Sequence, residues 1–117
     1  SYEKLPPFDK SEIFQRGDFL ATGTVYIRSM VMEQGGYNEM TPNCGLENYE
    51  LILKLVQSGS MGLHIGENLF AYRLHGNNIS TKRRSEIISY GKRLFNSLSM
   101  GTYSTNRFHP YKLDLNI

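Results

Sequence analysis

The sequence predicts an α/β fold class, an α+β fragment with three to four helices and a few short strands. Two observations lead to this class. Several segments place apolar residues at the i, i+3, i+4 spacing of a buried helix face, most clearly over residues 46–56. Other segments are short and rich in β-branched and aromatic residues, and Phe19–Ile27 is the best strand candidate. A chain of 117 residues can bury one modest core.

The composition is that of an ordinary globular protein, with 39% hydrophobic and 21% charged residues. No stretch approaches the roughly 18 consecutive apolar residues of a membrane span, and the start at Ser1 lacks the pattern of a signal peptide. The single cysteine, Cys44, has neither a disulfide partner nor a His or second Cys at metal-ligand spacing. We therefore interpret Cys44 as unreactive and expect a cytoplasmic protein.

The net charge of +2 hides an asymmetry. Residues 1–81 carry six Lys or Arg against nine Asp or Glu, a charge of −3. Residues 82–117 carry seven against two, a charge of +5. A basic segment of this size is most often a solvated face, but it also suits phosphates or an anionic membrane surface. Peripheral membrane contact through the basic C-terminal helix is therefore an alternative to a purely cytoplasmic location.

The chain divides into four segments. They are residues 1–16, an extended lead-in with Pro6-Pro7 and a short helix capped by Asp9 or Ser11; 17–80, a central segment; 81–101, an amphipathic helix; and 102–117, an irregular tail. Within the central segment we expect strands at Phe19–Ile27, Met61–Ile65 and Asn68–Leu74, and a two-turn helix at Arg28–Gln34 that ends at Gly35-Gly36. Gly23 in the middle of the first strand indicates a ligand or a neighbouring element close by.

Two longer helices complete the prediction. The central helix starts near Glu47 and stops at Ser58-Gly59. Two carboxylates, Glu47 and Glu50, lie in its first turn. Their interaction with the positive end of the helix dipole would stabilise the helix by about 0.3–1 kcal/mol each. The last helix covers about Thr81–Ser99, with Ser80 as its cap and Gly101 as its stop. Its apolar face comprises Ile87, Gly91, Leu94, Phe95 and Leu98, and Lys82, Lys92 and Arg93 lie away from that face.

Four motifs, in their order and spacing, resemble the C-terminal, acceptor-side half of family-2 inverting glycosyltransferases, which have the Rossmann-like GT-A fold. They are Gly17–Thr24, Gly35-Gly36-Tyr37-Asn38-Glu39, Leu46-Glu47-Asn48-Tyr49-Glu50-Leu51, and Phe70-Ala71-Tyr72-Arg73-Leu74-His75 followed by Ser80. The match covers roughly residues 17–80. The resemblance implies that a nucleotide-sugar donor gives its sugar, with inversion, to a glycan or lipid-linked acceptor, as in polysaccharide biosynthesis.

The resemblance also implies roles for individual residues. The expected site consists of Glu47 and Asn48 as catalytic residues, Gly23, Thr24, Tyr49 and Arg73 as substrate-binding residues, and His75 as a metal ligand. Asn48 stands where the family usually has the aspartate base. Because a carboxamide does not accept a proton near neutral pH, Glu47 would have to act as the general base.

A second departure from the family concerns the metal. The Asp-x-Asp motif that holds the metal and diphosphate is absent, and no glycine-rich nucleotide motif precedes residue 17. Hard divalent cations need such carboxylates. We therefore expect Mg²⁺ or Mn²⁺ in a longer parent protein but none bound to this fragment. The fragment alone would be inactive and would self-associate through its unpaired strand at Leu20–Ile27.

Plainer interpretations stay open. His75 suits a surface histidine beside a turn, and Arg73 could pair with Glu67. The eight tyrosines and the cluster Lys82-Arg83-Arg84 would also suit a non-catalytic domain that binds an acidic glycan or a partner protein. No known nucleic-acid motif is present, so we do not expect a nucleic-acid partner. Asn48 also allows an interaction domain whose active site has lapsed.

Overall fold

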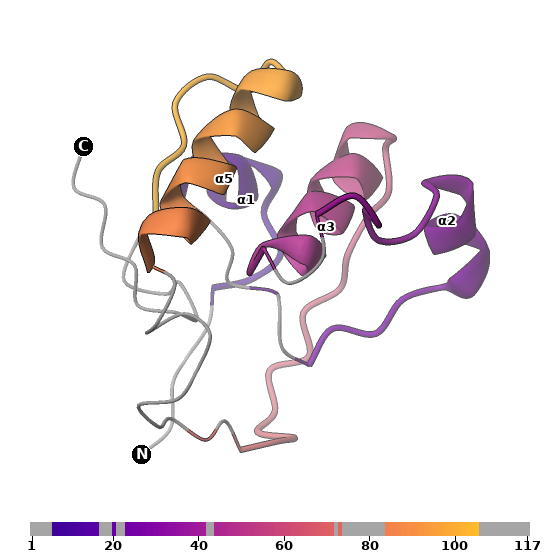
Figure 1. Ribbon diagram of the computed structural model, residues 1–117. Helices are drawn as coiled ribbons and strands as arrows, with labels where there is room; N and C mark the ends of the chain where they lie inside the picture. Colours follow the sequence, from indigo (N-terminus) through magenta and orange to yellow (C-terminus); the bar gives the residue numbers. More distant parts are fainter. Residues whose placement is uncertain are drawn as a thin grey trace.

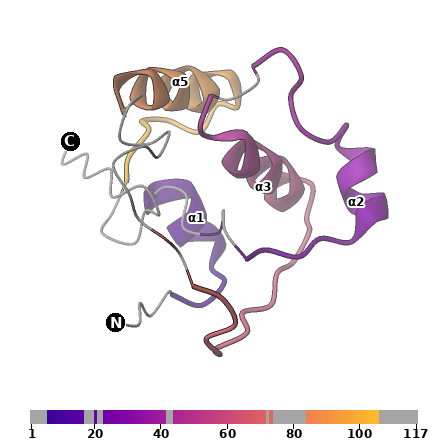
Figure 2. The same cartoon turned by 60° about the horizontal axis from the view of Figure 1, so that its bottom comes forward.

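The computed structural model describes residues 6–16, 20, 23–41, 44–71, 73 and 84–105. These ranges contain the helices α1 (Lys10–Arg16), α2 (Arg28–Glu33), α3 (Glu47–Gln57) and α5 (Arg84–Ser97). Helix α3 is central, with α1 and α5 on one side and α2 on the other (Figures 1 and 2). No described helix is long and apolar enough to cross a membrane.

The prediction of an α/β fold is wrong for the part of the chain that the structure describes, because that part contains no strand. The described residues of the three expected strands, 20 and 23–27, 61–65, and 68–71 with 73, form no sheet and lie outside the helices. Strand propensity mainly reflects packing against neighbouring strands. These apolar segments have no such neighbour among the described residues, so their composition alone does not produce a sheet. The described residues therefore do not form the expected half of a Rossmann-like GT-A domain.

The four predicted helices are present, but α5 ends at Ser97, before the predicted stop at Gly101. The left-handed residue after α5 is Ser99, with φ +55°, and the N–H of Met100 bonds the carbonyl of Phe95 at 2.9 Å.

Local signals determine the ends of the other helices. Asp9 caps α1, since its Oδ1 accepts hydrogen bonds from the backbone N–H groups of Ser11 at 2.8 Å and of Glu12 at 3.1 Å. Helix α3 ends as predicted at Ser58-Gly59. Gly59 has φ +93°, a conformation that glycine adopts without strain, and the N–H of Ser60 closes the turn on the carbonyl of Leu55 at 3.0 Å. Gly17, Ser80 and Lys82 lie outside the described residues.

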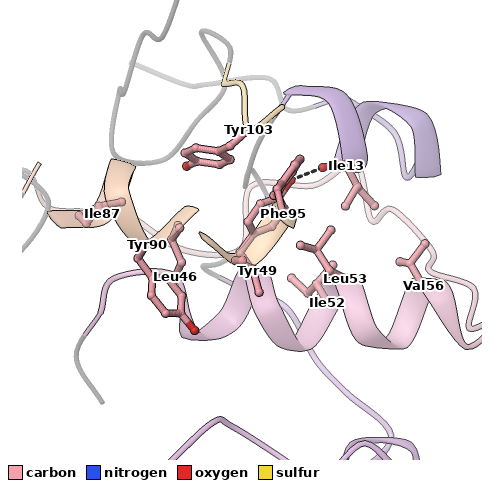
Figure 3. Close-up of a cluster of buried hydrophobic side chains, with 11 residues drawn as sticks. Ile13, Leu46, Tyr49, Ile52, Leu53, Val56, Ile87, Tyr90, Phe95 and Tyr103 are labelled. Atoms are coloured by element: carbon pink, nitrogen blue, oxygen red, sulfur yellow. Dashed lines mark hydrogen bonds between the residues drawn. The ribbon is translucent and has the colours of Figure 1, made fainter. Parts of the chain in front are cut away.

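The core forms where α5 packs across α3. Its buried members are Ile13, Leu46, Tyr49, Ile52, Leu53, Val56, Ile87, Tyr90, Leu94, Phe95 and Tyr103 (Figure 3). The Phe95 ring lies 6.0 Å from that of Tyr49 and 5.2 Å from that of Tyr103, centroid to centroid. Burying each large side chain stabilises the fold by about 1.5–3 kcal/mol. The predicted apolar face of α5 is confirmed, with Leu98 half-buried at its end.

Two glycines allow the close approach of neighbouring groups to α3 and α5. A Cβ atom on Gly45, which has φ +88°, would lie 2.7 Å from Cγ1 of Ile87. A Cβ atom on Gly91 would lie 2.4 Å from Cε1 of Tyr103. The ring of Tyr103 therefore lies directly on the backbone of α5. The described part of the expected irregular tail, residues 102–105, forms no helix or strand, but it packs on the core through the buried Tyr103.

Candidate functional site

The first turn of α3 carries the buried acidic residue Glu50, whose exposed fraction is 6%. Its Oε2 accepts a hydrogen bond from the hydroxyl of Tyr90 at 2.5 Å. Its Oε1 accepts one from Nδ2 of Asn38 at 3.3 Å and forms an ion pair with Nζ of Lys54, also at 3.3 Å. A buried carboxylate is stable only with such partners. These three side chains fix the Glu50 carboxylate in place, so its role is to stabilise the fold.

Tyr90 extends this network from α5. Its hydroxyl lies 3.1 Å from Oγ1 of Thr41, in addition to its bond to Glu50. Burial, followed by the hydrogen bond to the Glu50 carboxylate, raises the pKa of Tyr90 to about 12. A phenolate beside a carboxylate would be repelled, so the neutral phenol is the form that the fold favours. Tyr90 therefore acts as a permanent donor that joins α5 to α3.

Two of the four motifs meet at the start of α3. The hydroxyl of Tyr37 donates to Oδ1 of Asn48 at 2.6 Å. The neighbouring Asn38 donates to Glu50 through Nδ2 and accepts a hydrogen bond from the backbone N–H of Met40 at 3.0 Å through Oδ1. Side-chain hydrogen bonds thus attach the Gly35–Glu39 turn to the first turn of α3, which begins at Glu47.

Glu47, the first residue of α3, differs from Glu50 in its surroundings. It is half-exposed and makes no hydrogen bond or ion pair with any described residue. Its negative charge acts on Cys44, whose pKa is raised mainly by burial and then further by Glu47 and Glu50. Glu47 therefore lies close enough to Cys44 to influence it, with its carboxylate not engaged by another described side chain.

Cys44 lines an open groove of about 530 Å³ between the loop before α3 and one face of α5. The lining residues are Met40, Thr41, Cys44, Ser85, Glu86, Ser89, Tyr90 and Arg93. Four of them carry hydroxyl groups, and Glu86 and Arg93 offset each other's charge. The guanidinium of Arg93 lies 5.9 Å from the centre of the Tyr90 ring, within cation–π range. The groove is nearly neutral, and its lining combines these hydroxyl groups with the apolar Met40 and the thiol of Cys44.

The other predicted substrate-binding residues do not gather at this groove. The nearest side chain to Gly23 is the ring of Phe70, and Thr24 donates to the carbonyl of Leu20. Tyr49 is fully buried in the core and donates to the carbonyl of Ile13 (Figure 3), so no ligand from solvent can touch it.

The remaining predicted residues concern the diphosphate and the metal. Arg73 is exposed, and it forms no ion pair with Glu67 or any other described residue, so the alternative pairing with Glu67 is wrong. His75 lies outside the described residues. Among those that are described, no group of three or more His, Cys, Asp or Glu side chains could hold a metal ion. No chemical step below uses a metal.

Sequence reasoning missed the importance of Glu50 and Tyr90. A signal for Glu50 was present, because it lies four residues after Leu46 and three before Leu53, on the apolar stripe of α3. A carboxylate on such a stripe must find donors when the helix is buried. Tyr90 similarly lies three residues after Ile87 on the apolar face of α5.

Comparison with known protein families, with curated proteins and with solved structures finds no match to this chain. The resemblance to glycosyltransferases therefore rests on the four sequence motifs, two of which the side-chain contacts bring together.

Proposed function

We propose that this chain supplies the acceptor side of an inverting glycosyltransferase that uses a nucleotide-sugar donor, with Glu47 as the general base. One observation carries the proposal. The Gly35–Glu39 turn and the Glu47–Glu50 helix start, two motifs of the resemblance, are joined by the bonds from Tyr37 to Asn48 and from Asn38 to Glu50. Because side chains of the two motifs bind each other, the motifs lie together in the fold. This favours the resemblance to the glycosyltransferases over two unrelated matches in the sequence.

The two carboxylates of α3 would then have different tasks. Glu50 already accepts two hydrogen bonds and an ion pair, so its lone pairs are committed to the fold. Glu47 has no hydrogen bond or ion pair with a described residue and is half-exposed. Of these two carboxylates, Glu47 is the one that is open to solvent and not held by the fold. Asn48, bonded to Tyr37, would position the start of the helix.

In this mechanism the acceptor lies in the groove beside Cys44. An acceptor hydroxyl attacks the anomeric carbon of the donor sugar and forms the new glycosidic bond as its proton passes to the Glu47 carboxylate. The bond from the anomeric carbon to the nucleoside diphosphate breaks on the opposite face, and the diphosphate leaves with the electron pair. Attack from the opposite face inverts the configuration. Proton removal by a positioned base typically contributes about 10²–10⁴-fold in rate.

The test uses the longest natural gene product that contains this chain. Nucleoside diphosphate release would be measured with a panel of UDP- and GDP-sugars and glycan acceptors, and the anomeric configuration of the product determined by NMR. We expect acceptor-dependent release and an inverted product. Glu47→Gln should lower kcat by at least about 100-fold with little change in the acceptor KM, since the amide keeps the shape but cannot accept the proton. A retained configuration, or unchanged kcat in Glu47→Gln, would contradict the proposal.

A non-catalytic domain that binds an acidic glycan is the second candidate. It is favoured by Asn48 at the usual base position and by Arg93 in the groove. This domain would bind acidic oligosaccharides without releasing any nucleotide, and Arg93→Gln would weaken that binding while Glu47→Gln would not. In either case we propose a cytoplasmic location, for which the lone, half-buried Cys44 is suited.

A further inference from the structure

A second surface lies far from the groove. After α3, residues 60–71 form no helix or strand, and Figures 1 and 2 show them running to the side of the molecule away from α5. Within this stretch Met61, Leu63 and Ile65 expose 76%, 91% and 60% of their surface. Large apolar side chains at every second position of an exposed segment are unusual unless something covers them.

The contacts of the segment orient these side chains. A Cβ atom on Gly62 would lie 2.3 Å from Cδ2 of Phe8, so the Gly62 side of the segment rests on that ring. Strand pairing requires an extended chain, in which successive side chains point to opposite faces. In that conformation Met61 and Leu63 would point away from the face that Gly62 turns to Phe8.

Beyond Ser60, the backbone of the segment has no hydrogen-bond partner in the backbone of the described residues. The last backbone hydrogen bond before it joins the N–H of Ser60 to the carbonyl of Leu55. From residue 61 to residue 71, no backbone group bonds another described backbone group. An exposed extended chain with unpaired N–H and C=O groups is a template for pairing with another strand.

We propose that Ser60–Ile65 is a self-pairing edge, at which two copies of this chain associate as antiparallel strands about a two-fold axis at Leu63. This register places Leu63 opposite its own copy and Met61 opposite Ile65. All three apolar side chains of each copy then lie on one face of the new ribbon. The pairing is isologous, as expected for a closed dimer. It is independent of the proposed transferase function.

The charges of the segment favour a second copy over a membrane. Between Gly59 and Ala71 the only acidic or basic side chains are His64 and Glu67, which fall opposite Gly62 and Gly59 in the proposed register. Like charges therefore do not meet across the two-fold axis. Membrane-surface segments usually carry Lys and Arg beside their apolar residues, and a lone glutamate would be repelled by anionic lipids.

The exposed apolar area is below that of a standard interface and suits a weak dimer. A large apolar side chain corresponds to roughly 100 Å² at about 25 cal/mol per Å². Seven side chains that are between 54% and 94% exposed would therefore offer about 500 Å² per copy, against about 800 Å² for each side of a standard interface. They are Val25, Ile27, Met61, Leu63, Ile65, Leu69 and Phe70. The approach of Phe70 to Gly23 joins the two stretches to which these residues belong.

The first test is sedimentation equilibrium of the 117-residue chain. We expect a dimer with Kd in the range of about 1–100 μM. Leu63→Lys should weaken it at least 10-fold, because two lysines would meet across the axis. Met32→Lys is the matched control, since Met32 is also apolar and 64% exposed, on α2, but lies off the segment. A mixture of Leu63→Lys and Leu63→Glu should form a heterodimer, because residue 63 of one copy faces residue 63 of the other.

The second test is cross-linking. In a Cys44→Ser background, Leu63→Cys should form a disulfide-linked dimer on mild oxidation, in this chain and in the longest natural gene product, whereas Met32→Cys should not. A monomeric wild-type chain at several hundred micromolar, an unchanged dimer in Leu63→Lys, or equal cross-linking of both cysteine variants would overturn the proposal. So would binding of the monomeric chain to phosphatidylserine vesicles that Leu63→Lys abolishes.

Discussion

Removal of one hydroxyl group, in Tyr90→Phe, should measurably destabilise the fold. The Tyr90 hydroxyl is the only described donor to Oε2 of the buried Glu50, at 2.5 Å. Hydrogen bonds to charged groups contribute about 1.5–3 kcal/mol, and a buried charged acceptor left without its donor costs a similar amount. We therefore expect Tyr90→Phe to lower the free energy of unfolding by about 2 kcal/mol and Tm by roughly 10 °C.

Urea unfolding followed by circular dichroism measures this change, and Tyr37→Phe is the matched control. Tyr37 also donates to a side chain of α3, at 2.6 Å, but it is 51% exposed, so water can replace it. Its substitution should cost at most about 1 kcal/mol. A loss in Tyr90→Phe below about 0.5 kcal/mol, or one equal to that of the control, would refute the role assigned to the Glu50 network.

Three further predictions concern pH, packing and donor binding. The pKa of Tyr90 is about 12 in the folded chain and about 10 when unfolded. The contribution of its hydroxyl group to the free energy of unfolding is therefore complete below pH 10 and is lost as the pH rises towards 12. In urea titrations at alkaline pH, the wild type should lose this stability, whereas Tyr90→Phe should not. Gly91→Ala should lower the unfolding free energy by about 1–3 kcal/mol, because the new methyl group meets the Tyr103 ring; an unchanged value would show that the ring moves freely. In calorimetry with Mn²⁺, the 117-residue chain alone should bind UDP- and GDP-sugars no tighter than about 1 mM, and a micromolar signal would reveal donor contacts in this segment.

The helices were predictable because their signals are local. The carboxylate of Asp9 and the glycine at residue 59 act within one turn of the helix end that each determines. The apolar face of α5 was equally readable from its spacing. Such signals do not depend on what lies across the core.

The strands were not predictable in the same way. A strand needs a partner elsewhere, and nothing in Met61–Ile65 itself indicates whether one is present. Tyr103 was missed for a related reason, since its burial depends on the bare backbone of Gly91 on α5. The role of Glu50 depends on donors from both Asn38 and Tyr90, which lie 12 and 40 residues away in the sequence.

The rate of the double variant Glu47→Gln/Asn48→Asp tests most directly the claim that α3 begins with a catalytic carboxylate. It would be measured in the longest natural gene product, beside Glu47→Gln and Glu50→Gln. We predict that Glu47→Gln loses at least about 100-fold in kcat and that the added aspartate restores part of it, since a base is again present at the helix start. Glu50→Gln should mainly lower stability. A fall in kcat for Glu50→Gln in fully folded enzyme, with Glu47→Gln at the wild-type rate, would contradict the assignment.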